Sequence, residues 1–281
     1  MTTTHRPSGT DLARKRRLLA DSLAGMERVV VAYSGGVDSA FLAAAAHQAL
    51  SGRALAVTAV SPSLARRELA AATDLASRFG WNHRIVQTHE LARDEYARNA
   101  PDRCYWCKTE LFDVLEPIAA ELGASIAVGT NLDDLGDYRP GLRAASENGV
   151  RTPLADAGLG KGEVRALSAE LGLPTARKPA SPCLASRFAY GVRVTEEGLR
   201  RIDRAEDVVR SLGFEVFRVR DHGDLARIEV PAERIADAAR LHDHLAGELQ
   251  ELGFRYVTLD LMGFRSGSMN EVLGPPRLRP P

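Results

Sequence analysis

The first half of the chain alternates short β-rich segments with segments of helical periodicity. The β-rich segments are residues 27–34, 54–61, 83–88 and 124–129, and the helical ones are residues 39–52, 64–80 and 108–122. Such alternation predicts an α/β domain whose parallel strands are joined by right-handed helical crossovers, that is, a doubly wound sheet. A ligand of such a sheet binds at the carboxyl ends of the strands.

The pattern changes after about residue 192. A long amphipathic helix is expected over residues 194–213, followed by strands at 214–221, 225–230 and 256–263 and a helix at 234–252. This order predicts a smaller C-terminal α+β domain. We therefore expect one domain at residues 1–190 and a second, for substrate binding or oligomerisation, at 191–281, with the boundary in the irregular stretch 174–191.

Composition narrows the class of protein. The chain has 281 residues, 44% of them hydrophobic, and no apolar run long enough to span a bilayer, so we expect no membrane partner. Its N-terminus lacks the pattern of a secretory signal, which makes the cytoplasm the expected compartment. Lys and Arg balance Asp and Glu at 37 each, so no overall positive field attracts a nucleic acid, and none is expected as a partner.

The strongest local signal is the segment VVVAYSGGVDSAFL, in which an apolar strand leads directly into a helix start. Its connecting residues are Ser34, Gly35, Gly36, Val37, Asp38 and Ser39. Glycines let the backbone approach an anion closely, and the helix start adds its N–H groups and positive dipole end. No lysine ends the loop, so it is not the GxxxxGK[ST] nucleotide loop. Asp38 is either a Mg²⁺ ligand or an ordinary polar residue of the first helical turn.

The string SGGVDS at residues 34–39 resembles the pyrophosphate loop (PP-loop) of the N-type ATP pyrophosphatases, a superfamily of the adenine nucleotide alpha hydrolase-like fold. The resemblance implies that ATP is cleaved to AMP and pyrophosphate. It places Ala59, Val60 and Ser61 beside the adenine, mainly through their backbone. The loop at 129–134, which begins at Gly129, follows a predicted strand. Its carboxylates, Asp133 and Asp134, either bind magnesium or a ribose or form an ordinary helix N-cap and turn. Lys161 is either the second phosphate contact of the superfamily or a solvated surface lysine.

Only three cysteines occur, Cys104 and Cys107 in CYWC just before the helix expected at 108–122, and Cys183 far along the chain. A closed zinc site needs four ligands, and no pair of histidines at ligand spacing accompanies them. Three cysteines match a [4Fe–4S] cluster with one open iron, while a redox-active CxxC or buried cysteines remain the alternatives. We expect the three to converge at one edge of the ATP pocket.

Several further motifs accompany the loop: PDRCYWCK, GTNLDD, CLASRF, FRVRDHGDLARIEV and GFRSGSMN. Together they resemble the LarE family over residues 10–272. Members are ATP-dependent sulfurtransferases that act on pyridinium-3,5-biscarboxylic acid mononucleotide in the synthesis of the nickel-pincer nucleotide cofactor. In this family a cysteine at the position of Cys183 carries the sulfur, and some members sacrifice it and retain dehydroalanine. Cys104 and Cys107 depart from that single-cysteine pattern and match members with a cluster on three cysteines.

The resemblance also implies roles for residues around Cys183 and in the second domain. Ser186 and Arg187 are expected to bind the substrate phosphate or carboxylate. Arg218 and Arg220 alternate along a strand and so face one way, as phosphate contacts require. Trp106 either stacks on a pyridinium ring or fills the core. The family is expected to form homo-oligomers.

Two rival functions are weighed against this one. The first is tRNA thiolation by the same loop chemistry, which the balanced charge disfavours. The second is a regulatory module that binds ATP without turnover, which has no need of three cysteines and two arginine clusters.

Overall fold

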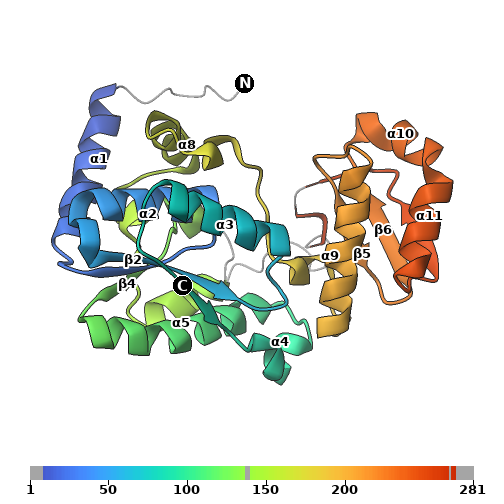
Figure 1. Cartoon of the computed structure of the whole chain (residues 1–281), viewed down its shortest axis with the longest axis horizontal. Helices are drawn as coiled ribbons and strands as arrows, with labels where there is room; N and C mark the ends of the chain where they lie inside the picture. The colour runs from blue at the N-terminus through green and yellow to red at the C-terminus, as the bar shows by residue number, and fades with distance from the viewer. Residues whose placement is uncertain (1–8, 137–139, 266, 270–281) are drawn as a thin grey trace, which may run out of the picture. The chain divides into compact units, whose positions relative to one another are not determined.

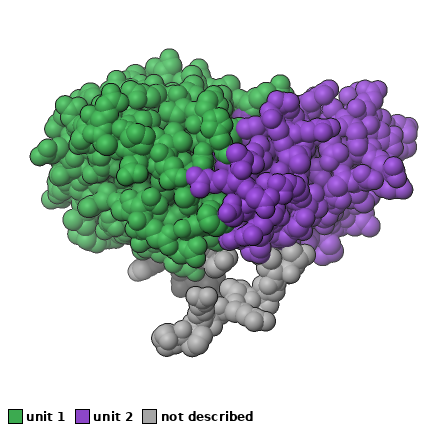
Figure 2. All heavy atoms as spheres, turned by 90° about the horizontal axis from the view of Figure 1, so that it is seen from below, with its two compact units in different colours: residues 1–61, 66–89, 104–181 green, residues 62–65, 90–103, 182–281 purple. Residues whose placement is uncertain are grey.

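The computed structural model describes residues 9–136, 140–265 and 267–269, and the chain divides into two compact units (Figures 1 and 2). Unit 1 comprises residues 1–61, 66–89 and 104–181, and unit 2 comprises residues 62–65, 90–103 and 182–281. Residues 62–65 and 90–103 thus group with unit 2, so no single boundary along the chain separates the two units. The division at residue 190 stays a prediction.

Unit 1 contains a four-stranded parallel sheet of order β3-β2-β1-β4. Its strands are β1 (Val29–Ala32), β2 (Ala54–Val60), β3 (His83–Gln87) and β4 (Ser125–Ala127). The chain winds outward from β1 to β3 and then returns to place β4 on the other side of β1. This is the predicted doubly wound α/β sheet, with its reversal of strand order between β1 and β4.

Helices cover both faces of this sheet (Figure 1). One face packs against α2 (Val37–Leu50) and α3 (Arg66–Arg78), and the other against α5 (Arg103–Leu122). Helices α1 (Gly9–Ala24) and α8 (Lys161–Glu170) pack against α2 and extend the first core. Because side chains alternate along a strand, Val29 and Val31 join the first core while Val30 joins the second. Burial on both faces explains why β1 reads as a continuous apolar run.

Helix α5 begins earlier than the sequence indicated. The predicted start at residue 108 was wrong, because the helix already includes Cys104 and Cys107 in its first two turns. Pro101 and Asp102 precede it, and both residue types favour the positions around a helix start. This helix has 20 residues but carries charges along its length, and no described helix is both long and apolar enough to cross a membrane.

Smaller elements connect the strands of unit 1. They are α6 (Pro140–Glu147) and α7 (Pro153–Asp156), with 3-10 turns η1 (Ser51–Arg53), η3 (Leu132–Gly136) and η4 (Pro174–Arg177). The turn η3 follows β4 directly and carries two carboxylates of the loop singled out in the sequence. It therefore lies at the carboxyl end of the sheet.

Unit 2 contains a separate three-stranded sheet of order β5-β6-β7. Its elements are α4 (Asp94–Ala97), α9 (Glu196–Ser211), β5 (Arg218–Asp221), β6 (Leu225–Glu229), α10 (Ile235–Arg240), α11 (His242–Glu251) and β7 (Tyr256–Leu259), with 3-10 turns η2 (Glu90–Ala92), η5 (Leu184–Arg187) and η6 (Ala232–Arg234). This confirms a smaller α+β part. The single helix expected at 234–252 is wrong, because Leu241 leaves the helical region at φ −97° and ψ 17°.

Candidate functional site

The reversal of strand order in unit 1 defines where a ligand belongs. Strands β1 and β4 are neighbours at which the strand order reverses, and a doubly wound sheet binds its ligand at the carboxyl ends of such strands. The loop after β1 is the phosphate loop of residues 34–39, and the loop after β4 begins at Gly129. The structure thus brings together two segments that the sequence analysis had singled out separately.

The phosphate loop presents backbone donors and two hydroxyls. Helix α2 starts at Val37 and its N-cap residue Gly36 has no side-chain cap, so the first N–H groups of the helix point out of its end. The hydroxyls of Ser34 and Ser39 lie 3.0 Å apart, and the Ser34 amide donates to the Ser39 hydroxyl at 3.1 Å. Such a loop is suited to phosphate oxygen atoms.

Two glycines are required by close packing around this loop. Gly35 has φ +72°, and a Cβ there would lie 2.8 Å from the Cβ of Ala72 on α3. At Gly129 a Cβ would lie 2.8 Å from the backbone of both Asp38 and Ser39. The loop after β4 therefore touches the first turn of α2 directly.

A lysine and three polar side chains surround Asp38. Lys161, the first residue of α8, pairs with the Asp38 carboxylate, and the Asn131 side-chain amide donates to its other oxygen at 3.3 Å. The Asp133 carboxylate accepts from the Lys161 amide at 2.7 Å. Asp134 accepts from the Asn131 amide at 3.1 Å.

This donor set fits a magnesium ion. Mg²⁺ is usually held by one or two carboxylates together with substrate phosphates and water. No group of three His, Cys, Asp or Glu side chains placed to hold a metal occurs among the described residues. That pattern is compatible with Mg²⁺ that enters with ATP, since Asp38 supplies a carboxylate beside the loop.

The end of β2 offers backbone groups at the same carboxyl edge of the sheet. Pairing of β1 with β2 ends at Ala32 and Val57, so β2 continues past β1. The Tyr33 amide donates to the Val57 carbonyl, and the Thr88 amide to the Val60 carbonyl. Because parallel strands alternate the direction of their backbone groups, those of Ala59 face the β1 side, beyond the end of that strand. Ser61 follows the last residue of β2 and is half-buried.

No motif in the sequence points to Lys178 or Glu68, which form an ion pair at the phosphate loop. The Lys178 ammonium donates to the Gly35 carbonyl at 2.9 Å and pairs with Glu68 at 2.7 Å. Burial alone would raise the pKa of Glu68, but hydrogen bonding and the charge of Lys178 bring that pKa below its usual value. Lys178 follows η4 in a stretch with no recognisable pattern, and no spacing in the sequence connects it to a glycine 143 positions away.

Cys104 and Cys107 lie three positions apart on α5, which places them on one helix face. Cys104 is exposed and Cys107 is half-buried. The half-buried Trp106 between them meets Tyr105 edge-on, with ring centroids 5.1 Å apart. Accessible thiols on one helix face fit the donor chemistry of an iron–sulfur cluster. The convergence with Cys183 stays a prediction.

In unit 2, Cys183 is exposed and stands immediately before η5. Arg187, at the end of this turn, is 1% exposed and forms two hydrogen bonds with Glu206, at 2.8 and 3.1 Å. The same guanidinium donates to the carbonyls of Pro182 and Cys183 and to the Ser186 hydroxyl. Every nitrogen of Arg187 is thus engaged, which makes it a support for the Cys183 turn in this conformation.

Arg218 and Arg220 lie on β5, two positions apart as expected. Arg220 is buried and bonds to Glu229 at 2.7 Å, to the Ser186 carbonyl at 3.2 Å and to the Ser268 hydroxyl at 3.3 Å. Arg218 is partly buried and stacks on Phe264. Burial and the nearby guanidiniums of Arg187 and Arg220 lower the pKa of Arg218 to about 10. Burial is the larger of these causes, and the carboxylates of Glu206 and Glu229 act in the opposite direction.

Comparison with known proteins identifies the family. The model of the NAD synthase family matches residues 17–102, which include the phosphate loop. A pyridinium-3,5-bisthiocarboxylic acid mononucleotide synthase from Lactiplantibacillus plantarum is 43% identical over 265 residues, covering 93% of this chain and 96% of that protein. The chain belongs to the LarE family.

Other relatives extend this comparison. An uncharacterised protein from Synechocystis is 49% identical to this LarE family chain over 253 residues, covering 88% of this chain and 94% of the relative. A tRNA-specific 2-thiouridylase from Azorhizobium caulinodans is 35% identical over 194 residues, covering 55% of this chain and 49% of that enzyme. Similarity to the thiouridylase is therefore partial, whereas similarity to the synthase spans both units.

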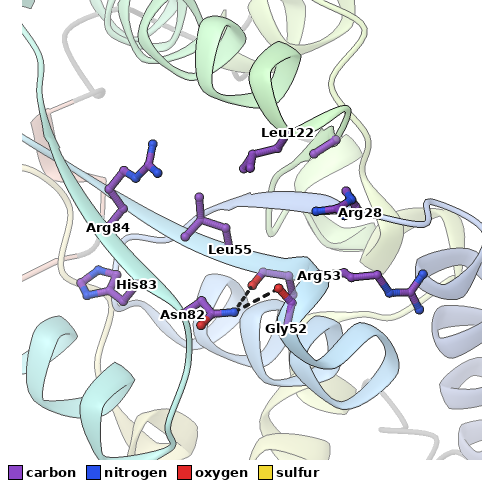
Figure 3. Close-up of a pocket in the computed structure, with 10 residues that line it drawn as sticks. Arg28, Gly52, Arg53, Leu55, Asn82, His83, Arg84 and Leu122 are labelled. Atoms are coloured by element: carbon purple, nitrogen blue, oxygen red, sulfur yellow. Dashed lines mark hydrogen bonds between the residues drawn. The ribbon is translucent and has the colours of Figure 1, made fainter.

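In unit 1, a hollow of about 390 Å³ lies at the amino ends of the strands, the edge of the sheet opposite to the phosphate loop (Figure 3). At its base the Asn82 amide donates to the carbonyls of Gly52 and Ala54. The remaining lining residues are Arg28, Arg53, Leu55, His83, Arg84, Leu122 and Ala124. None of them is a residue of the carboxyl edge, so this hollow is separate from the candidate site.

Proposed function

We propose that this chain uses ATP to adenylate a carboxylate of pyridinium-3,5-biscarboxylic acid mononucleotide and then replaces AMP with sulfur. Attack of the carboxylate on the α-phosphorus of ATP forms an acyl-adenylate and releases pyrophosphate. Sulfur then attacks the acyl carbon, and AMP leaves. The product is a thiocarboxylate, the class of compound made in nickel-pincer nucleotide biosynthesis.

The observation that carries this proposal is the 43% identity to a synthase of the corresponding bisthiocarboxylate over 96% of its length. The aligned region covers 93% of this chain and therefore spans the phosphate loop, the cysteines and β5. The phosphate-loop geometry supports the ATP-dependent half of the reaction independently.

In the first half-reaction, residues of the carboxyl edge bind ATP. The amides of Gly35, Gly36 and Val37 and the two serine hydroxyls of the loop bind the phosphate oxygens. Ala59 and Ser61 bind the adenine through their backbone, and Gly129 lets the loop after β4 pack against the first turn of α2. Asp38 would hold Mg²⁺, which would neutralise phosphate charge, and Lys161 beside it supplies a further positive charge for the phosphates. Holding the two reactants in line and neutralising their charge lowers the barrier.

The second half-reaction needs a sulfur atom at the activated carbonyl. Without an external donor, the Cys183 thiolate attacks the carbonyl and expels AMP. Loss of the Cα proton then breaks the Cβ–S bond, leaving dehydroalanine in the protein and the thiocarboxylate in the product. Alternatively, Cys104, Cys107 and Cys183 hold a [4Fe–4S] cluster, which would supply a sulfide bound at its open iron. In either case Ser186 lies three residues from Cys183 and contributes a hydroxyl near the reacting carbonyl.

The substrate is an anion with an aromatic ring, and unit 2 offers matching groups. Arg218, whose guanidinium is partly buried and stacks on Phe264, binds the substrate phosphate. Arg220 and Arg187 support this site through their contacts with the Ser186 and Cys183 backbone. Trp106 belongs to unit 1, and its stacking on the pyridinium ring stays a prediction from the sequence. We further propose that the enzyme is a cytoplasmic homo-oligomer, which size-exclusion chromatography with light scattering would test.

The decisive experiment incubates anaerobically purified protein with ATP, Mg²⁺, sulfide and the biscarboxylate nucleotide. Mass spectrometry then follows nucleotide, substrate and protein together. We expect AMP and pyrophosphate only when the biscarboxylate is present, together with a thiocarboxylate product. ADP and phosphate as products would refute adenylation. A protein mass reduced by that of hydrogen sulfide identifies Cys183 as the donor, whereas an unchanged mass with repeated turnover and brown protein identifies the cluster.

Thiolation of tRNA is the second candidate, favoured by the partial identity to a tRNA-specific 2-thiouridylase. The equal numbers of acidic and basic residues weigh against it, because tRNA binding relies on positive charge. Filter binding of tRNA across a salt series distinguishes the two candidates. We expect no salt-sensitive binding. ATP binding with no pyrophosphate release, whatever the carboxylate, would instead support a regulatory module.

A further inference from the structure

The phosphate loop is held from outside by a lysine that no motif includes. Lys178 donates to the Gly35 carbonyl at 2.9 Å, and its side chain is only 20% exposed. Its ammonium also contacts the Glu68 carboxylate at 2.7 Å, and that side chain is 12% exposed. Because Glu68 balances its charge, Lys178 adds little net positive charge to the loop.

The backbone of Lys178 is itself fixed by α8. Arg165 on that helix donates to the Ala176 carbonyl at 2.6 Å and to the Lys178 carbonyl at 2.9 Å. The same helix begins with Lys161, the partner of Asp38. Helix α8 therefore positions two lysines beside the loop. Lys161 is its first residue, and Arg165, four residues later, holds the backbone of Lys178.

The geometry of the peptide bond gives the Lys178 contact a consequence. The Gly35 carbonyl and the Gly36 N–H belong to one planar trans peptide and point in opposite directions. A hydrogen bond that holds the carbonyl toward Lys178 therefore holds the N–H toward the inside of the loop. The Gly36 N–H indeed points to the Ser34 hydroxyl, to which it donates at 3.4 Å. Glycine on both sides of the peptide bond leaves this orientation otherwise weakly constrained, with Gly35 at φ +72°.

We propose that Lys178 is a positioning residue of the ATP site, which aims the Gly36 N–H at the phosphates by holding the carbonyl of the same peptide. It does not touch ATP. This inference rests on the proposed ATP-dependent function only in requiring that the loop bind ATP phosphates. It adds a residue that acts through the backbone rather than as a ligand.

Lys15 offers a matched control. Its ammonium pairs with Glu163 at 2.8 Å, and the two side chains are 16% and 13% exposed, close to the values for Lys178 and Glu68. Both ion pairs belong to unit 1. Glu163 lies on α8, and the backbone of Lys178 is held by Arg165 of the same helix. Lys15 makes no contact with the phosphate loop among its hydrogen bonds. Lys15→Met therefore removes an equivalent ion pair and leaves the Gly35 peptide alone.

The experiment compares wild type, Lys178→Met, Lys178→Arg and Lys15→Met in three measurements. Binding of a non-hydrolysable ATP analogue is titrated without the carboxylate substrate, the Gly36 amide is observed by NMR with ¹⁵N-glycine labelling, and stability is measured in urea. We expect Lys178→Met to weaken analogue binding about ten- to hundredfold, as for loss of a hydrogen bond to a charged group. Its Gly36 amide signal should shift before any nucleotide is added. Lys178→Arg should restore much of the affinity.

Other outcomes separate the possible failures. If Lys178→Met and Lys15→Met lose equal stability and both bind the analogue as wild type does, Lys178 is only part of an ion pair and the inference is wrong. If binding weakens while the Gly36 signal stays in place, Lys178 contacts the phosphates directly, which also overturns it. Failure of the wild-type protein to bind the analogue would refute the proposed function instead.

Discussion

The phosphate loop of unit 1 and the Cys183 turn of unit 2 satisfy their polar groups in different ways. In the loop, Ser34 and Ser39 bond to each other and to amides within five residues, and the start of α2 keeps its N–H groups without a side-chain cap. At the Cys183 turn, Arg187 is buried and bonds to Glu206 and to three groups of the turn itself. The first region is prepared for an anion, whereas the second is held in shape by its own charged side chain.

This difference separates residues that act on a ligand from residues that support a site. A buried guanidinium with all its donors engaged cannot exchange them for a substrate without leaving a buried carboxylate alone. The half-exposed pair of Lys161 and Asp38 has no such constraint, because water compensates either partner. Stability measurements therefore test the comparison before any substrate is added.

The largest effect is expected for Arg187→Met. Removal of one partner of a buried pair leaves the Glu206 charge uncompensated and should lower the free energy of unfolding by about 3–5 kcal/mol. Lys161→Met, the matched change in the exposed pair, should cost about 1 kcal/mol or less and yet impair pyrophosphate release. Urea unfolding of both variants checks this. Equal losses of stability would remove the distinction between the two regions.

The next effect concerns the contact between the β4 loop and α2. In Gly129→Ala the new Cβ would lie 2.8 Å from two backbone atoms of α2, which no side-chain rotation relieves. We expect a loss of about 1–3 kcal/mol, as for overpacking of a tight core, together with weaker ATP binding.

Gly162→Ala is the control, since a Cβ there meets nothing within 4 Å and Gly162 lies inside α8. Its stability should rise by about 0.4–1 kcal/mol. Thermal and urea unfolding report both values, and an unchanged Gly129→Ala protein would mean that the loop can withdraw from α2.

A smaller effect is expected at the start of α9, which carries Glu206. The Thr195 hydroxyl accepts from the Gly198 amide at 3.1 Å and caps this helix. Thr195→Ala should cost about 1 kcal/mol. Thr195→Ser keeps the hydroxyl and should stay close to wild type in urea unfolding. If both variants lost the same stability, the threonine methyl group rather than the cap would be responsible.

The comparison also explains what the sequence allowed us to predict. The phosphate loop was predictable because its strand, glycines, hydroxyls and helix are contiguous, and the parallel doubly wound sheet followed from the alternation of strands with helices. Lys178 was not, because its partner Gly35 lies 143 positions away and only the folded chain brings them together. The ion pair of Arg187 with Glu206 could not be predicted for the same reason. Ser266 and Asn270 of the GFRSGSMN motif lie outside the described residues.

The smallest expected effect is the pH dependence contributed by Glu68. Burial opposes its ionisation, but Lys178, with smaller contributions from Arg67 and Ser181, lowers its pKa below the ordinary value of 4.5. A carboxyl whose pKa is lower in the folded than in the unfolded state binds more protons when unfolded. It therefore adds stability above pH 4.5, and this contribution is lost as the pH falls through the folded-state pKa.

Glu68→Gln removes this titration and leaves the shape of the side chain nearly unchanged. The difference in unfolding free energy between wild type and Glu68→Gln should therefore be largest near pH 7. It should shrink steadily between about pH 6 and about pH 3 as the wild-type carboxylate takes up a proton. Urea unfolding at a series of pH values measures this difference directly. A difference that stayed constant, or grew in acid, would show that the Lys178 ion pair does not stabilise the fold around the phosphate loop, and the loop would then owe its shape to Gly35 and α2 alone.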